Sequence, residues 1–185
     1  MDACAGVGGK TAHIAERLEG RGRVIAVDTD RERLIRSKKN LERLGLDGVE
    51  TVEGDVCRGG WPESDRVLVD APCSGLGTVR RRPDIKWAVS EEDVTSRLPS
   101  LQGKILRAAA QAVKPGGALV YATCSAEPEE NEGVVNAFLT ERKDFVVEAP
   151  PLPAVLASPD GFVRLRPDLH GTDGFFIARL TRKAM

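Results

Sequence analysis

The sequence predicts an α/β fold in which a mostly parallel sheet carries helices on both faces. Short apolar runs rich in β-branched residues alternate with segments of helical periodicity along the chain. Some of these runs are continuously apolar, as in strands that are buried on both faces. A glycine-rich loop, Asp2–Thr11, opens the first helical segment. We expect one domain, residues 1–185.

The order of the elements follows from these patterns. In doubly wound folds a central strand leads into the glycine loop, and here only Met1–Ala3 precede it. We therefore expect the first strand to be largely missing and the domain to be truncated at its N-terminus. The next expected elements are a helix at Thr11–Leu18, a strand at Arg23–Val27 ending at Asp28, a helix at Arg31–Leu44 stopped by Gly45, a strand at Val49–Val52 closed by Gly54 and Asp55, and a strand at Arg66–Val69.

The second half of the chain continues the alternation. Apolar residues at helical spacing predict an amphipathic helix over Ser100–Val113, with Ser100 as its N-cap. The remaining expected elements are a turn at Pro115–Gly117, a strand at Ala118–Ala122, a helix at Glu129–Glu141, strands at Phe145–Val147 and Phe175–Ala178, and a proline-rich loop at Ala149–Gly161 between these two strands.

The composition restricts the class of protein. The chain has 41% hydrophobic and 30% charged residues and a formal net charge of −1. These values are ordinary for a globular cytoplasmic protein and argue against a uniformly basic nucleic-acid coat. No apolar run approaches the roughly 18 residues of a membrane span. The four cysteines lie far apart and have no histidine at metal-ligand spacing, so we expect free thiols and no metal.

Two cysteines follow directly on apolar, strand-like runs. Asp70 and Cys73 follow the run at residues 66–69, and Cys124 follows the run at 118–122. Ligands of open α/β sheets bind at the carboxyl ends of the strands, so this placement indicates nucleophilic chemistry. The alternative is that both cysteines are small buried hydrophobes, which is the interpretation we prefer for Cys4 and Cys57.

The glycine loop favours S-adenosylmethionine over other nucleotide ligands. The dinucleotide fingerprint fails because Thr11 stands where the third glycine should be, and the P-loop fails because Cys4 stands where its first glycine should be. Glycines at a helix N-terminus suit the carboxylate of S-adenosylmethionine. Asp28 could accept hydrogen bonds from ribose hydroxyls, and Asp55 could meet an adenine ring. The alternative is that these aspartates only cap turns.

Together, the motifs resemble those of the Sun-type (RsmB-like) RNA cytosine-5 methyltransferases. The residues that carry the resemblance are Asp2–Thr11, Asp70–Gly75, Gly77–Trp87, Ala122–Ser125 and Asp173–Phe176. The resemblance covers nearly the whole chain and implies the Rossmann-like class I S-adenosylmethionine-dependent methyltransferase fold. It departs from the family at Val7, where the family usually has proline. It also implies an N-terminal RNA-binding region, which family members of this branch usually carry.

The resemblance assigns roles to the motif residues. It implies that Cys124 is the nucleophile and that Cys73 assists product release. The implied ligands of S-adenosylmethionine are Cys4, Ala5, Gly6, Val7, Gly8, Gly9, Lys10, Asp28, Asp55 and Asp70. The implied substrate is RNA, with ribosomal RNA expected.

The chemistry of cytosine explains why such an enzyme needs a thiol. Carbon 5 of cytosine is a poor nucleophile until a thiolate adds to carbon 6, which turns the ring into an enamine. The site must favour the thiolate, and Lys10 or the sulfonium of the cofactor could do so. Asp70 could hydrogen-bond ring nitrogen 3 as the adduct forms. Cys73 is suited to proton removal from carbon 5.

A basic segment follows the first cysteine motif. Arg80, Arg81, Arg82 and Lys86 lie in one loop and could contact RNA phosphates, although a charge run is often only solvated. Trp87 could stack on a base, but we expect it to cover core. Two alternatives stay open: a DNA cytosine methyltransferase with Cys73 as nucleophile, and a fragment that binds cofactor or RNA without activity.

Overall fold

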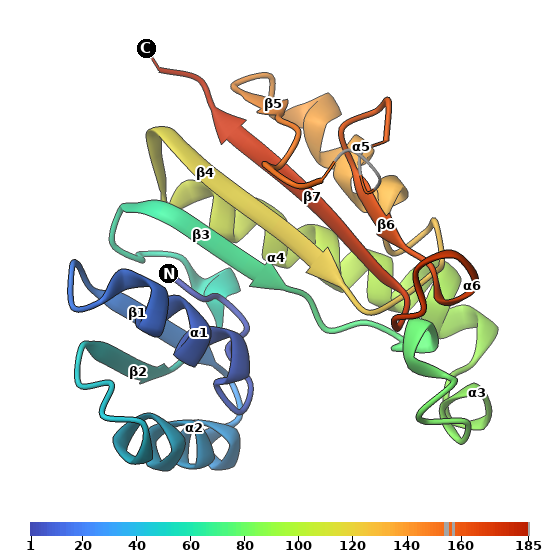
Figure 1. Cartoon of the computed structure of the whole chain (residues 1–185). Coiled ribbons are helices and arrows are strands. Elements are labelled where there is room, and N and C mark those ends of the chain that lie inside the picture. The colour runs from blue at the N-terminus through green and yellow to red at the C-terminus, as the bar shows by residue number, and fades with distance from the viewer. Residues whose placement is uncertain (154–155, 157, 185) are drawn as a thin grey trace.

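The computed structural model describes residues 1–153, 156 and 158–184, and it confirms the alternation of strands and helices (Figure 1). Three short turns of 3-10 or π type, at Val56–Arg58, Leu76–Thr78 and Asp93–Arg97, join longer elements. The helices are α1 (Gly9–Leu18), α2 (Arg31–Arg43), α3 (Ile85–Ala88), α4 (Leu98–Gln111), α5 (Glu132–Glu141) and α6 (Pro167–His170). The strands are β1 (Val24–Asp28), β2 (Val49–Glu53), β3 (Ser64–Asp70), β4 (Val113–Thr123), β5 (Phe145–Val147), β6 (Val163–Leu165) and β7 (Phe175–Arg182).

The strands form two groups that the N-terminal residues connect. β2 pairs with β1, and β3 pairs with β4, both in parallel. Between the two groups, Asp2 forms parallel bridges to Ala26 of β1 and to Leu68 of β3. Its N–H donates to Ile25 O at 2.8 Å, and the N–H of Ala3 donates to Leu68 O at 2.8 Å. Met1–Ala3 therefore occupy the position of a short central strand.

The sheet is mixed at its other edge. β7 runs antiparallel to β4 and also to β5 and β6, which pair with different parts of β7. Among the strands described here, β7 thus runs opposite to the others. The other strands share one direction, as expected for a mostly parallel sheet. The β3–β4 register places Asp70 opposite Ala122, so the residues that follow both strands emerge at the same carboxyl edge.

Helices cover both faces of the sheet. Val67 and Val69 of β3 point into the core with α4 and α5, where Leu106 and Phe138 are fully buried. Side chains alternate along a strand, so Leu68 faces the other side. There it lines, with residues of α1, a groove of about 650 Å³. This groove lies toward the amino ends of β1 and β3 and includes none of the predicted site residues.

Several expected boundaries were wrong for identifiable reasons. Ser100 is not an N-cap: α4 begins at Leu98, because a π turn leads into it and Pro99 fits the first turn of a helix. α5 begins at Glu132 rather than Glu129, because Asn131 has a non-helical backbone (φ −109°, ψ −100°). Residues 115–117, expected as a turn, lie within β4 beside a register shift in its pairing with β3.

Some of the C-terminal structure was not predicted. β6 and α6 occupy a region for which we expected no regular element, and β7 continues four residues beyond Ala178 to Arg182. The expected loop at Ala149–Gly161 includes residues 154, 155 and 157, which lie outside the described residues. In the part that the structure describes, no helix is long and apolar enough to cross a membrane.

Candidate active site

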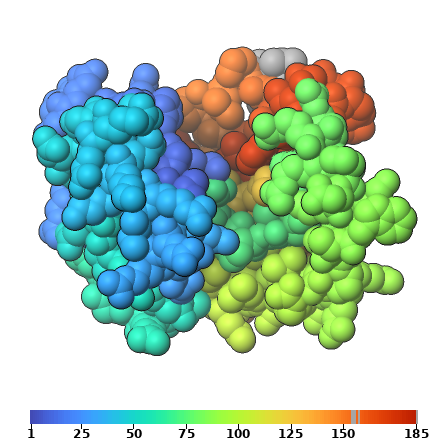
Figure 2. Space-filling model, turned by 90° about the horizontal axis from the view of Figure 1, so that it is seen from below, coloured from blue at the N-terminus to red at the C-terminus, as the bar shows by residue number. Residues whose placement is uncertain are grey.

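The two predicted cysteines meet at the carboxyl edge of the sheet. Cys124 follows β4 directly, and Cys73 lies three residues beyond the end of β3. Their sulfur atoms are 3.3 Å apart, within hydrogen-bonding distance, and both residues are half-buried. Figure 2 looks at the molecule from below and shows its surface hollowed between the N-terminal part in blue and the segment around α3 in green. Both thiols are free.

The surroundings shift the pKa values of the two thiols in opposite directions. The pKa of Cys124 is lowered to about 7, mainly by the hydrogen bond from Cys73 and to a smaller extent by the charge of Lys10, whereas burial and Asp70 act in the opposite direction. Donating that hydrogen bond, together with burial, raises the pKa of Cys73. Because the thiolate is the nucleophilic form of cysteine, the geometry favours Cys124 as the attacking group.

Asp70 lies beside the cysteines and pairs with Lys10. Lys10 Nζ, from the first turn of α1, lies 2.6 Å from Asp70 Oδ2 and 5.8 Å from the centre of the Phe175 ring. The ion pair is partly exposed, so it contributes little to stability. Its effect is positional, because it places a cation and a carboxylate at the mouth of the cysteine site.

The glycine loop is shaped by its contacts with β1 and α2. Gly6 N–H donates to Asp28 Oδ2 at 2.7 Å. Gly8 has a positive φ of 84°, and a Cβ atom there would collide with Ser37 of α2. Gly8 is also the N-cap of α1, with no side-chain cap and no acidic residue in the first turn. The free N–H groups at this helix start fit the carboxylate of an amino-acid ligand such as S-adenosylmethionine.

Asp28, the last residue of β1, and Asp55, which follows β2, also act as turn caps. Asp28 accepts a second hydrogen bond, from Asp30 N–H at 2.9 Å, and is 9% exposed. Asp55 caps the turn after β2 by accepting from Cys57 N–H at 2.9 Å. Both aspartates therefore cap turns, as the alternative to ligand binding expected. Capping does not prevent ligand binding, because each carboxylate oxygen can accept more than one hydrogen bond.

Of the cysteines expected to be structural, Cys4 packs against the core, where burial raises its pKa. Cys57, at the turn after β2, is exposed, so the interpretation of Cys57 as a small buried hydrophobe was wrong. A metal site was not expected, and no cluster of three or more potential metal ligands occurs among the described residues.

The basic segment separates into paired and unpaired residues. Arg80 and Arg81 both contact the carboxylate of Asp173, which is 9% exposed, so they help to hold the segment before β7. Arg82 and Lys86 are exposed, and within the described chain neither forms an ion pair. The expectation that Trp87 covers core was wrong, because this side chain is 84% exposed.

Close backbone packing holds the turn that carries Cys124. Gly77 N–H donates to Cys124 O at 3.0 Å, and Gly174 N–H donates to Gly77 O at 2.8 Å. A Cβ atom on Gly77 would collide with the backbone of Gly174 and of Cys124. These two glycines, part of the motifs quoted above, are therefore needed for a close approach of three chain segments.

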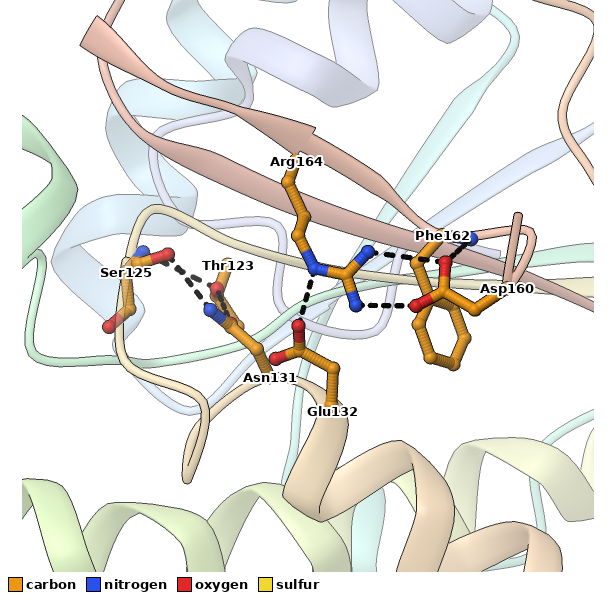
Figure 3. A network of polar contacts seen from close by, with 7 residues as sticks. All are labelled: Thr123, Ser125, Asn131, Glu132, Asp160, Phe162 and Arg164. Carbon is orange, nitrogen blue, oxygen red and sulfur yellow. Dashed lines mark hydrogen bonds and ion pairs between the residues drawn. The ribbon is translucent and has the colours of Figure 1, made fainter. Parts of the chain in front are cut away.

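Sequence reasoning missed a group of buried polar residues behind the cysteines. Glu130 and Asn131 were placed within a helix, yet they lie in the turn before α5, where Asn131 bonds to Thr123 and Ser125 (Figure 3). Gln102 of α4 joins the group through Glu130. The available signal was an acidic and amide run, residues 129–132, shortly after a cysteine motif.

Comparison with known proteins gives consistent results. The family described as 16S rRNA methyltransferase RsmB/F matches residues 1–181. A probable ribosomal RNA small subunit methyltransferase B from Bacillus subtilis is 40% identical over 195 residues, covering 99% of this chain and 43% of that protein. The Klebsiella pneumoniae ribosomal RNA small subunit methyltransferase B is 44% identical over 190 residues, covering 99% of this chain and 42% of the relative. The chain thus spans under half the length of these relatives.

Solved structures agree with the fold. NSun6 from Pyrococcus horikoshii, solved with SFG, superimposes with a TM-score of 0.86 at 35% identity, covering 98% of this chain and 47% of that one. An S-adenosylmethionine-dependent O-methyltransferase from Thermotoga maritima, 16% identical, shares the fold with a TM-score of 0.60 over the whole of this chain and 58% of that one. The expected S-adenosylmethionine-dependent methyltransferase fold is confirmed. The chain belongs to the 16S rRNA methyltransferase RsmB/F family, as its motifs predicted.

Proposed function

We propose that this chain is the catalytic region of a cytoplasmic enzyme that methylates carbon 5 of cytosine in ribosomal RNA through a covalent adduct on Cys124. The observation that carries the proposal is the pair of thiols 3.3 Å apart at the carboxyl edge of the sheet. Family membership and relatives described as ribosomal RNA small subunit methyltransferases support RNA as the substrate. The NSun6 structure, solved with SFG, an analogue of S-adenosylmethionine, supports S-adenosylmethionine as the cofactor.

S-adenosylmethionine fits the loop at residues 4–10, with Asp28, Asp55 and Asp70 beside it. When bound, it supplies an electrophilic methyl group on a sulfonium. The chain's contribution there is to bind and orient. The unpaired N–H groups at the start of α1 would hold a carboxylate, and Asp28 would accept hydrogen bonds while it keeps Gly6 in place.

The reaction begins and ends at Cys124. Its thiolate adds to carbon 6, and the electron pair of the carbon 5–carbon 6 double bond becomes available at carbon 5 while Asp70 supports the proton on ring nitrogen 3. Carbon 5 would then take the methyl group from the bound S-adenosylmethionine, and the electron pair of the broken carbon–sulfur bond would stay on the sulfur, leaving S-adenosylhomocysteine. A base then removes the carbon 5 proton, the electron pair reforms the double bond, and the bond from carbon 6 to sulfur breaks to regenerate the thiolate. Cys73, in contact with the departing sulfur, is placed to assist this last stage.

The exposed residues around α3 would contact the RNA. Lys86 Nζ lies 5.3 Å from the centre of the Trp87 ring, so a cation and an aromatic face are presented together. Such a pair can bind a phosphate and stack on an unpaired base. Arg82 would add a phosphate contact, whereas Arg80 and Arg81 would act mainly through Asp173. The target base must be unpaired or flipped out to reach Cys124.

The test is trapping with RNA that contains 5-fluorocytidine, because fluorine on carbon 5 cannot leave as the proton does. With S-adenosylmethionine present, the chain should form an adduct that survives denaturing electrophoresis, and Cys124→Ala should lose it. Cys73→Ala should keep it and should also accumulate an adduct with unmodified RNA.

Loss of the adduct in Cys73→Ala with retention in Cys124→Ala would reverse the roles, as in the DNA cytosine methyltransferase alternative. Preference for a fluorinated DNA over the RNA would exclude RNA as the substrate. If the chain shows no adduct and no heat of binding with S-adenosylhomocysteine, the alternative of an inactive fragment holds.

A further inference from the structure

Behind the two cysteines, the carboxylate of Glu130 is completely buried and accepts four hydrogen bonds. Its Oε1 accepts from the backbone N–H of Ser74 and from the side-chain amide of Gln102, both at 2.9 Å. Its Oε2 accepts from the hydroxyls of Ser74 at 2.5 Å and Ser125 at 2.6 Å. Four donors use the full acceptor capacity of a carboxylate. Within the described residues no cation contacts Glu130.

The donors that Glu130 joins belong to the two cysteine turns. Ser74 directly follows Cys73, and Ser125 directly follows Cys124, although the two serines are 51 residues apart in the chain. Each hydroxyl has one hydrogen, which it donates to Glu130, so the carboxylate is the shared acceptor of both turns. The Tyr121 hydroxyl donates to Glu130 O at 2.6 Å and anchors its backbone to β4.

Neighbouring contacts keep this arrangement in one position. Asn131 accepts from the Thr123 hydroxyl at 2.5 Å and donates to Ser125 O at 3.0 Å, so it holds the residues on both sides of Cys124. Figure 3 shows these bonds and, beyond them, Glu132 paired with Arg164 of β6. The turn that carries Glu130 is therefore fastened to β4 on one side and to β6 on the other.

Packing alone does not explain a buried carboxylate that has no cation beside it, because its burial is unfavourable. Removing a charge from water is unfavourable unless partners replace the water, and apolar residues of similar volume often serve stability equally well. Here the replacement partners are donors from the two cysteine turns and from α4. Two of the donating residues, Ser74 and Ser125, directly follow Cys73 and Cys124.

We propose that Glu130 is a positioning residue whose carboxylate sets the separation of Cys73 and Cys124, so that Cys73 donates its hydrogen bond to Cys124. The roles of the two thiols rest on the proposed function, whereas the geometric effect does not. If the separation increases, the Cys124 thiolate loses the donor that stabilises it most. Glu130 itself does not contact the reacting atoms.

The test is the pH dependence of Cys124 alkylation by iodoacetamide in the full chain, read by peptide mass spectrometry, which requires no RNA. In Glu130→Gln an amide N–H₂ group replaces one of the two carboxylate oxygens. This group cannot accept hydrogen bonds from the donors that surround it. The midpoint should move from about pH 7 toward the value of about 8.5 for a free thiol, with roughly tenfold slower alkylation at pH 7. Lys10, Asp70 and Cys73 face Cys124 and stay unchanged in this variant.

Two comparisons isolate the effect. Glu129→Gln makes the same change at the exposed neighbouring residue and should leave the midpoint in place. Cys73→Ala should raise the midpoint as Glu130→Gln does, and combining the two changes should give no further rise, because both remove the same hydrogen bond. Additive shifts would mean that Glu130 acts on Cys124 by another route and would overturn the proposal.

Folding of the variants is checked by circular dichroism, and Ser74→Ala, which removes only one arm of the network, replaces Glu130→Gln if that variant does not fold. An unchanged pH midpoint of Cys124 alkylation in a folded variant would contradict the proposal. Failure of the fluorocytidine trap in the wild-type chain would instead reject the proposed function and leave the alkylation result standing, so the two failures can be told apart.

Discussion

The two halves of the sheet hold their functional groups in different ways. The half built on β3, β4 and β7 holds a large cluster of buried apolar side chains, to which the residues up to Val56 contribute Ala3 and Val56. In this half, buried side chains such as Glu130 and Asn131 form hydrogen bonds to the turn that carries Cys124. The half built on β1 and β2 buries apolar residues of its own, among them Val27, Leu34 and Leu41. It instead presents a glycine loop held by main-chain bonds and by Asp28.

This difference matches what each half is proposed to do. Covalent chemistry needs two sulfur atoms at a defined distance, and side chains locked in a core supply that precision. A cofactor site needs free N–H groups and room for a ligand, so its loop is left with unmet donors. The halves connect through Met1–Ala3 and through the ion pair of Lys10 with Asp70. We therefore expect substitutions in one half to leave the other half's property largely unchanged.

The largest expected effect tests that separation at Asp28. Asp28→Ala removes the acceptor that holds Gly6, and it should weaken binding of S-adenosylhomocysteine by roughly 10- to 100-fold, since hydrogen bonds to a charged group contribute about 1.5–3 kcal/mol. Isothermal titration calorimetry measures the affinity, with exposed Asp47→Ala as the control. The alkylation midpoint of Cys124 should not move; a shift would show that the halves are coupled.

The pH dependence of the thiols sharpens the comparison within the catalytic half. With a pKa of about 7, the thiolate fraction of Cys124 grows as pH rises through 7, so its alkylation rate should increase about tenfold between pH 6 and pH 8. Cys73 and Cys4, whose pKa values are raised, should react far more slowly over this range. Faster labelling of Cys73 than of Cys124 would contradict the assignment of the nucleophile.

A smaller effect should appear at the contact between the halves. Lys10→Met removes a charge that lowers the pKa of Cys124, and it should slow alkylation at pH 7 by about two- to threefold, as expected for a partly exposed charge. It should also weaken S-adenosylhomocysteine binding, because Lys10 belongs to the loop. Lys38→Met, on the exposed side of α2, is the matched control. A change in only one of the two properties would show that Lys10 serves a single half.

The last prediction concerns the stability of the fold at Asp2, which joins the halves. Burial raises the pKa of this carboxyl, and its Oδ1 has no partner. The folded chain therefore binds this proton more tightly than the unfolded chain, and the carboxylate destabilises the fold as pH rises through the folded-state pKa. Asp2→Asn keeps the bond from Thr11 and should stabilise the chain at pH 7 by about 1 kcal/mol, with a melting temperature a few degrees higher. The gain should vanish below about pH 4; a gain that persists there would have another cause.

Local patterns in the sequence were sufficient for the order of the longer elements and for which residues lie at the candidate site. Strand and helix periods repeat within a few residues, so β1, α2 and β3 could be located to within one or two positions of their ends. The cysteine motifs and the glycine loop are likewise contiguous. They predicted the family and the edge of the sheet at which Cys73 and Cys124 meet.

Only the tertiary structure decided which thiol is acidic, that Trp87 is exposed, and that Glu130 lies beneath both cysteine turns instead of on a helix. Each depends on contacts between residues dozens of positions apart, which no local period encodes. The acidity of a thiol is set by the atoms around its sulfur, and the burial of a side chain is set by what packs against it. Both exist only after β3, β4 and the turn before α5 have come together.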